Sequence, residues 1–65
     1  MNTRTPAPIL QPGELTRLRE AAGMTQAQLA ALAGYTRQTV GDHERGTVPI
    51  RLSASNAYRY VLERS

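Results

Sequence analysis

Residues Gly34 and Tyr35 constrain the fold of this chain more than any other pair, because they alone separate two segments that carry helix signals. The first segment, 25–33, opens with TQAQ, a T-x-x-Q pattern in which two polar side chains satisfy free backbone N–H groups. The second, 36–45, opens with Thr36, a preferred residue just before a helix. Glycine commonly ends a helix because it adopts a left-handed backbone freely. So short a connection forces the two helices to cross at a sharp angle.

Two further helices are predicted on either side of this pair, which makes the fold all-α. Pro12 suits the first turn of a helix over 12–22, and Gly23 suits its end. A last helix is predicted over 52–63, after a connector in which Pro49 prevents helix continuation. Apolar residues at a helical period predict the core: Leu15, Leu18 and Ala22, then Leu29, Leu32 and Ala33, and finally Ala54, Ala57, Tyr58, Val61 and Leu62.

Size and composition limit what the chain can do. Its 65 residues predict one small domain with a modest core. Without cysteine it has no disulfide framework, zinc knuckle or thiol nucleophile, and no apolar run approaches the roughly 18 residues of a membrane helix. Residues 1–9 are predicted to be a flexible arm, or an arm that reaches a DNA groove through Arg4 and Thr5, and 10–65 the folded domain. A cytoplasmic protein without membrane association is expected.

The charge balance allows two interpretations. Eight arginines, no lysine and five carboxylates give a net charge of +3. A basic chain suits a polyanionic partner such as a nucleic acid. A charge of this size is also ordinary for a small domain, so composition does not choose between the two.

The segment 36–45 has two dissimilar faces when it is wound as a helix at about 100° per residue. The face predicted to meet the core holds Thr39, Val40, His43 and Glu44. The other face holds Arg37, Gln38, Gly41, Asp42 and Arg45. Arginine and glutamine make paired hydrogen bonds to guanine and adenine edges, whereas glycine costs a helix roughly 1 kcal/mol relative to alanine. This pattern fits a face that reads DNA bases, and equally a polar surface with one poor helix former.

The stretch LTRLREAAGMTQAQLAALAGYTRQTVGDHERG closely resembles the Cro/C1-type helix-turn-helix family, also called the XRE family. Among the matching positions are Leu15, Arg19, Gln26, Leu29, Gly34, Thr36, Val40, Glu44 and Gly46. The resemblance covers about residues 12–62. It implies a lambda-repressor-like domain of four to five helices that binds double-stranded DNA through the helix after Gly34.

The resemblance also implies roles for individual residues. Base-reading positions fall on Arg37, Gln38, Gly41 and Asp42. Phosphate-binding positions fall on Gln26, Thr25, Thr39, Arg45 and Thr47. Arg19 and Glu44 fall on a structural salt bridge between the first and third helices, and Gln26 is also expected to brace the recognition helix.

Three residues depart from the family pattern. Gly41 replaces a residue that is usually polar, and is expected either to admit the DNA closely or to read nothing. Asp42 places a negative charge near phosphates, where it accepts a hydrogen bond from a cytosine amino group or repels wrong sites. His43 replaces a common aliphatic or aromatic residue, and a packed histidine is favoured over a pH sensor.

The resulting prediction is a transcriptional repressor that autoregulates its own operon. One recognition helix reads few base pairs, so a homodimer on a palindromic operator is expected. The dimer interface is predicted on the last helix, at Tyr58, Tyr60 and Leu62, with a solvated Tyr60 as the alternative.

Other functions have less support. An antitoxin-like module that binds a partner protein and also represses its operon is the alternative, with residues 1–9 as the binding segment. The tail VPIRLSASNAYRYVLER resembles, more weakly, that of short phage and anti-CRISPR-associated autoregulators. No carboxylate pair, nucleophile–base pair or phosphate loop predicts an enzyme, and no cofactor, metal or small-molecule ligand is expected.

Overall fold

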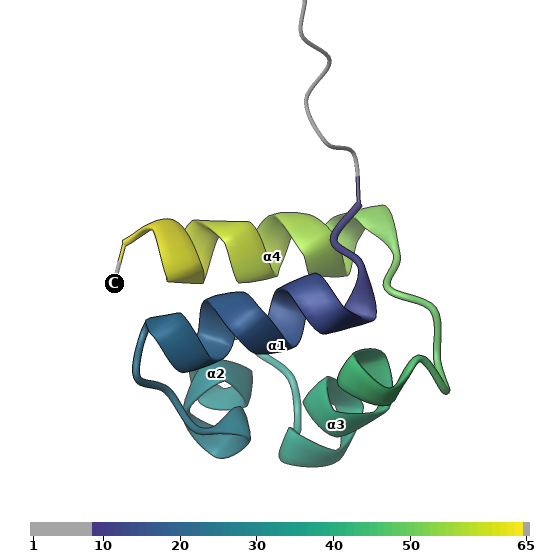
Figure 1. Cartoon of the computed structure of the whole chain (residues 1–65), viewed down its shortest axis with the longest axis horizontal. Helices are drawn as coiled ribbons and strands as arrows, with labels where there is room; N and C mark the ends of the chain where they lie inside the picture. The colour runs from purple at the N-terminus through teal and green to yellow at the C-terminus, as the bar shows by residue number, and fades with distance from the viewer. Residues whose placement is uncertain (1–8, 65) are drawn as a thin grey trace, which may run out of the picture.

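The computed structural model describes residues 9–64. This part of the chain contains four α-helices joined by short loops, and no strand. They are α1 (Pro12–Ala21), α2 (Gln26–Ala33), α3 (Arg37–Arg45) and α4 (Leu52–Glu63) (Figure 1). The all-helical prediction is confirmed, and each predicted helix is present within one residue of its expected ends. Most of the predicted arm, including Arg4 and Thr5, lies outside the described residues.

The connection between α2 and α3 is built as its residue types predict. At the start of α2, Thr25 Oγ1 accepts a hydrogen bond from the Gln28 backbone N–H at 3.0 Å, and Gln28 Oε1 accepts one from the Thr25 N–H at 2.8 Å. Gly34 ends α2 with φ +84°, a left-handed conformation that other residues adopt only with strain. Thr36 Oγ1 then accepts from the Thr39 N–H at 3.1 Å and starts α3.

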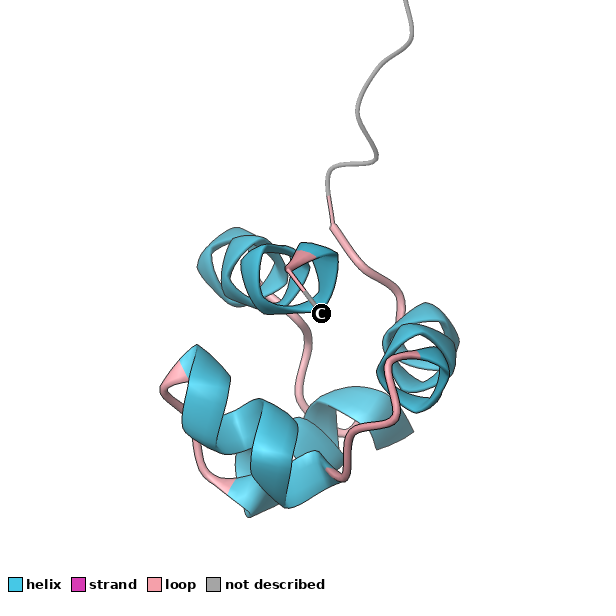
Figure 2. Ribbon diagram, turned by 90° about the vertical axis from the view of Figure 1, so that its left-hand side faces the viewer, coloured by secondary structure: helices cyan, strands magenta, loops and turns pink. Residues whose placement is uncertain are grey.

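The core fills the space that the four helices enclose. Figure 2 looks nearly along α1 and α4, which stand apart, with α2 and α3 closing the space beneath them. The buried apolar side chains come from all four helices and from the segments before α1 and α4: Leu10, Leu15, Leu29, Ala30, Val40, Ile50, Ala54 and Tyr58. Burying these groups is the main favourable term in folding.

Two leucines that were predicted to join the core are exposed instead. Leu32 keeps 63% of its surface accessible, and Leu18 is also exposed, whereas Ala30 is buried. The helix α2 reads QAQLAALA and is apolar around most of its circumference. A period of 3.6 residues therefore cannot select which side of this helix packs inward, and packing against α3 and α4 makes that choice.

Among residues 9–64, no helix has the length and apolar character required to cross a membrane.

Candidate nucleic-acid interface

An ion pair between α1 and α3 fixes the orientation of the third helix. Arg19 Nε donates to Glu44 Oε2 at 2.6 Å, and Arg19 Nη2 donates to Glu44 Oε1 at 3.1 Å. Both side chains are largely buried. Arg19 Nη1 also donates to the Met24 carbonyl at 2.8 Å, which ties the loop before α2 to the same group. This is the pair that the family resemblance implies, and its two-pronged geometry suits an arginine buried against a carboxylate.

Gln26 joins this network from the first residue of α2. Its Nε2 donates to Glu44 Oε1 at 3.0 Å, so one carboxylate links α1, α2 and α3. Burial alone would raise the pKa of Glu44, but hydrogen bonds from Arg19 and Gln26 outweigh it and hold the pKa below its usual 4.5. The hydrogen bond to Glu44 likewise raises the pKa of Arg19. The pair therefore stays ionised near neutral pH.

The N-terminus of α2 lies beside this network. Thr25 is exposed, and its hydroxyl is engaged by the Gln28 N–H. Within the described chain, the N–H groups of Gln26 and Ala27 donate to no other residue. Unused N–H groups at a helix start are positively polarised and suit an anion such as a phosphate.

The predicted base-reading and phosphate-binding residues of α3 lie along its outer side and C-terminal end. Arg37 and Gln38 are exposed in the first turn. Thr39 is half-buried, and its hydroxyl shares a hydrogen bond with the Thr36 hydroxyl at 3.0 Å. Arg45 is exposed at the last turn. Thr47 is exposed just beyond it, with its N–H donating to the Asp42 carbonyl at 3.0 Å.

Gly41 lies on this outer side, yet it is buried. The Arg45 side chain folds back over it, so that Nη1 lies 3.3 Å from the position a Cβ on Gly41 would occupy. Gln26 Oε1 lies 3.7 Å from the same position. The ends of two long polar side chains therefore lie over Gly41. Whether this position admits DNA closely or reads nothing stays a prediction.

His43 packs between α3 and α4, as a buried histidine. Its Nδ1 shares a hydrogen bond with the Tyr58 hydroxyl at 2.7 Å, and its ring meets the rings of Tyr35 and Tyr58 edge to face. Burial lowers the pKa of His43, although the nearby Asp42 carboxylate opposes this effect. Burial also raises the pKa of Tyr58 to about 12. The contact fastens α3 to α4.

The prediction that Tyr58 borders a dimer interface is wrong. This residue has 0% of its surface accessible, because its ring fills the core and its hydroxyl is engaged by His43. The period of α4 places Tyr58 in the core stripe, and the packing of α1 and α2 against α4 leaves no surface on which a second chain could contact it.

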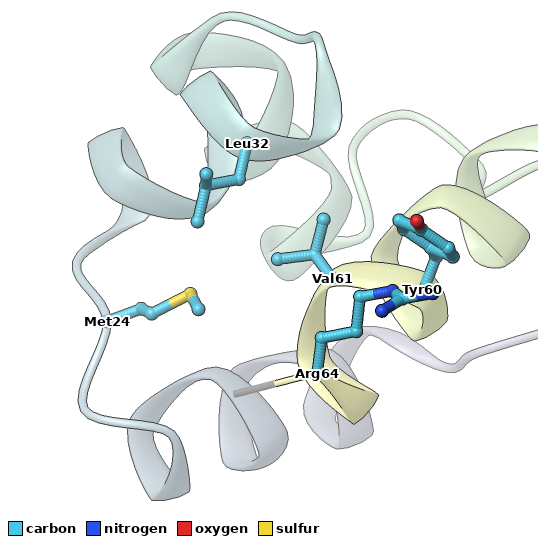
Figure 3. A pocket seen from close by; sticks show the side chains of 5 residues that line it. All are labelled: Met24, Leu32, Tyr60, Val61 and Arg64. Carbon is cyan, nitrogen blue, oxygen red and sulfur yellow. The ribbon is translucent and has the colours of Figure 1, made fainter.

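The other two predicted interface residues have different surroundings. Leu62 is half-buried and packs against the core. Tyr60 is 60% exposed, and the Arg64 guanidinium lies 4.2 Å from its ring centroid. Tyr60 and Arg64 form one wall of a shallow apolar groove, with Met24 and Leu32 opposite (Figure 3). The sequence predicts Leu32 in the core instead of on the surface, because the helical period of the largely apolar α2 does not show which side faces solvent.

Residues 9–64 contain no group of three or more His, Cys, Asp or Glu side chains that could hold a metal ion.

Comparison with known proteins agrees with this geometry. A protein-family model described as a helix-turn-helix domain matches residues 13–60, which includes nearly all of α1, all of α2 and α3, and most of α4. No curated protein and no solved structure matches the chain. The match confirms the helix-turn-helix prediction over the segment that carries the ion pair, the capped α2–α3 connection and the exposed side of α3.

Proposed function

The chain belongs to the helix-turn-helix domain family, and from that premise we propose that it is a sequence-specific repressor of transcription that binds double-stranded DNA. The observation that carries the proposal is the way in which α3 is held. Val40, His43 and Glu44 fix its inner side to the rest of the domain. On its outer side, the side chains of Arg37 and Gln38 are exposed. Neither side chain makes an ion pair or hydrogen bond to the described chain. A rigid helix with a free polar face suits the major groove.

Base reading is assigned to the outer side of α3. Arg37 and Gln38 stand in its first turn, the part of a recognition helix that enters the groove deepest. Their side chains match the edges of guanine and adenine respectively, through two hydrogen bonds each. Asp42 and Gly41 belong to the same face one turn later.

Phosphate binding is assigned to residues around this face. The free N–H groups at the start of α2 and the Gln26 amide would hold one phosphate, with Thr25 beside them. Thr39, Arg45 and Thr47 would contact phosphates at the far edge of the helix. Such contacts set the position of the protein on DNA and carry no sequence information by themselves.

A homodimer on a palindromic operator completes the proposal, because two recognition helices are needed for adequate specificity. Tyr60 and Leu62 remain the proposed interface residues on α4. The exposed Leu32 and the partly buried Met24 extend this surface across the groove of Figure 3. Repression of its own operon would follow from occupying the promoter. The alternative, an antitoxin-like function, depended on residues 1–9, most of which lie outside the described chain.

Selection of duplexes from a random library tests base reading directly. The wild-type protein should enrich a palindrome with half-sites about 10 base pairs apart. Replacing Arg37 or Gln38 by alanine should abolish the preference at particular base pairs, at a cost of about 1–3 kcal/mol each. Gln26→Ala should instead weaken binding to every duplex and flatten the dependence on salt. Unchanged preferences in both α3 variants would refute the assignment of α3 as the recognition helix.

A further inference from the structure

Three residues on the outer side of α3 form a single unit. Arg45 Nη2 contacts Asp42 Oδ1 in an ion pair, and Arg45 Nη1 lies over Gly41. The Arg45 side chain thus runs back along the helix toward its N-terminus, and 64% of its surface remains accessible. Asp42 is the less exposed partner, at 22%.

The helix itself explains why these three positions meet. Side chains on a helix lean toward its N-terminus, so residue 45 covers positions 42 and 41, which lie three and four residues before it. Glycine at position 41 leaves the space into which the guanidinium folds. A Cβ there would lie 3.3 Å from Nη1, closer than nearly all real Cβ contacts. Gly41 and Asp42 both depart from the family pattern, and both contribute to one arrangement. Gly41 leaves the space and Asp42 forms the ion pair that place the Arg45 guanidinium over the middle of the helix face.

We propose that Arg45 reads a guanine, with Asp42 as its positioning residue and Gly41 as the space that it needs. This inference rests on the proposed function, and it exchanges two roles within it. Arg45 is a base-reading residue instead of a phosphate ligand, and Asp42 orients that arginine instead of contacting a base.

The chemistry of the pair fits this assignment. A guanidinium has five N–H donors in a planar fork, and Asp42 engages one nitrogen of that fork. Donors on the remaining edge are free to pair with guanine O6 and N7, the commonest specific contact of arginine in the major groove. The carboxylate also reduces the number of conformations that the long side chain can adopt, so less entropy is lost when it meets the base.

The ion pair between Arg45 and Asp42 also reduces the repulsion that the Asp42 carboxylate would have with DNA phosphates. An unpaired carboxylate on a DNA-binding face would be repelled by phosphates. In the free protein, the positive charge of Arg45 already balances the negative charge of Asp42. Its paired oxygen is already occupied, which disfavours its use as an acceptor for a cytosine amino group.

The test is a selection from random duplexes with the full chain and its variants Arg45→Ala, Asp42→Asn and the two combined. Wild type should prefer guanine at one position of each half-site. Arg45→Ala should lower that preference about tenfold to a hundredfold and leave the other positions unchanged. Asp42→Asn should cause a smaller loss at the same position. It should have no further effect there when Arg45 is already alanine, as coupled residues do in a double-mutant cycle.

Arg17→Ala is the matched control, since it removes one exposed arginine from α1. It should leave every base preference intact, and circular dichroism should show that all the variants are folded. Uniform weakening by Arg45→Ala, with a salt slope smaller by about one, would assign Arg45 to a phosphate and overturn the inference. An Asp42→Asn effect at a separate base pair would overturn the positioning role. Failure of the wild-type chain to enrich any duplex would instead refute the proposed function.

Discussion

On the outer side of α3, the missing side chain of Gly41 matters as much as the polar groups around it, because it leaves space for other side chains. The sequence predicts that Gly41 destabilises α3, because glycine is a poor helix former. In the folded chain it is the position over which Arg45 and Gln26 lie. Its backbone is ordinary right-handed helix, unlike that of Gly23, Gly34 and Gly46, each of which has a positive φ. Its role is steric and not conformational.

Gly41→Ala is therefore expected to stabilise the fold while it impairs DNA reading. Alanine gains up to about 1 kcal/mol of helix propensity at this position, and the one atom that it displaces is Nη1, at the end of the flexible Arg45 side chain. The thermal midpoint of unfolding should rise, and the guanine preference should fall because Arg45 is displaced. Gly34→Ala is the contrasting control, and should destabilise the protein by about 1–2 kcal/mol because its φ is +84°. A lower midpoint for Gly41→Ala would show that the space over position 41 is needed for folding itself.

At the scale of elements, two polar contacts attach α3 to α1 and α4, beside its packing against α2. The Arg19–Glu44 pair attaches it to α1, and the His43–Tyr58 contact attaches it to α4. These two contacts leave from neighbouring residues of α3 and reach different helices. Together with the Gln26–Glu44 hydrogen bond and the buried Val40, they hold α3 in position and fix its rotation about its own axis. That rotation determines which side chains face outward.

The His43 contact should make stability depend on pH in a defined window. Burial lowers the pKa of His43 from its usual 6.5, against the opposing effect of Asp42, so the unfolded chain takes up a proton more readily than the folded one. The contribution of His43 to stability should be constant above pH 6.5 and should be lost as the pH decreases below 6.5 through the lowered pKa. Chemical unfolding of wild type and His43→Gln across this range measures the effect.

The variant His43→Gln should be less stable at neutral pH and should lack the slope just below pH 6.5. Glu44 contributes separately and at lower pH. Because its pKa is held below 4.5, its share of stability is present above pH 4.5 and is lost as the pH falls further. An equal slope in both proteins between pH 6.5 and 4.5 would contradict the assignment to His43.

For the whole molecule, the question is which surface joins two copies. Among residues 9–64, three large apolar side chains are more than half exposed: Leu32, Leu52 and Tyr60. Leu32 and Tyr60 both line the groove of Figure 3, whereas Leu52 begins α4 at its other end. An apolar groove between two helices is the kind of surface that another chain can cover. The proposed dimer is therefore expected to bury Leu32 and Tyr60 and to leave Leu52 in solvent.

Replacing Leu32 or Tyr60 by glutamate should weaken self-association at least tenfold, because each change places a charge in the proposed interface. Sedimentation velocity over a range of protein concentrations measures it. Leu52→Glu is the matched control and should associate like wild type. Binding to a single half-site should persist in all three variants, while cooperative binding to the palindrome should be lost only in the first two. A monomer that is unaffected by any of the changes would refute this interface.

The sequence alone predicts the four helices and the sharp connection at Gly34, because caps, glycines and prolines act through contacts a few residues apart. It also determined which side of α3 meets the core, since that helix has a single aliphatic residue, Val40, and a clear polar face. The family pattern supplied the Arg19–Glu44 pair. All of these depend on local chemistry or on a strong repeated motif.

Three features depend on the folded chain: which side of α2 is buried, the complete burial of Tyr58 in the core, and the position of Arg45 over Gly41. The helix α2 is apolar on most sides, so its orientation depends on neighbours distant in the sequence. Tyr58 has its role because His43, 15 residues earlier, meets its hydroxyl. The position of Arg45 depends on a missing side chain and a carboxylate acting together. Periodicity assigns each residue to a face, but only packing shows which atoms occupy the space there.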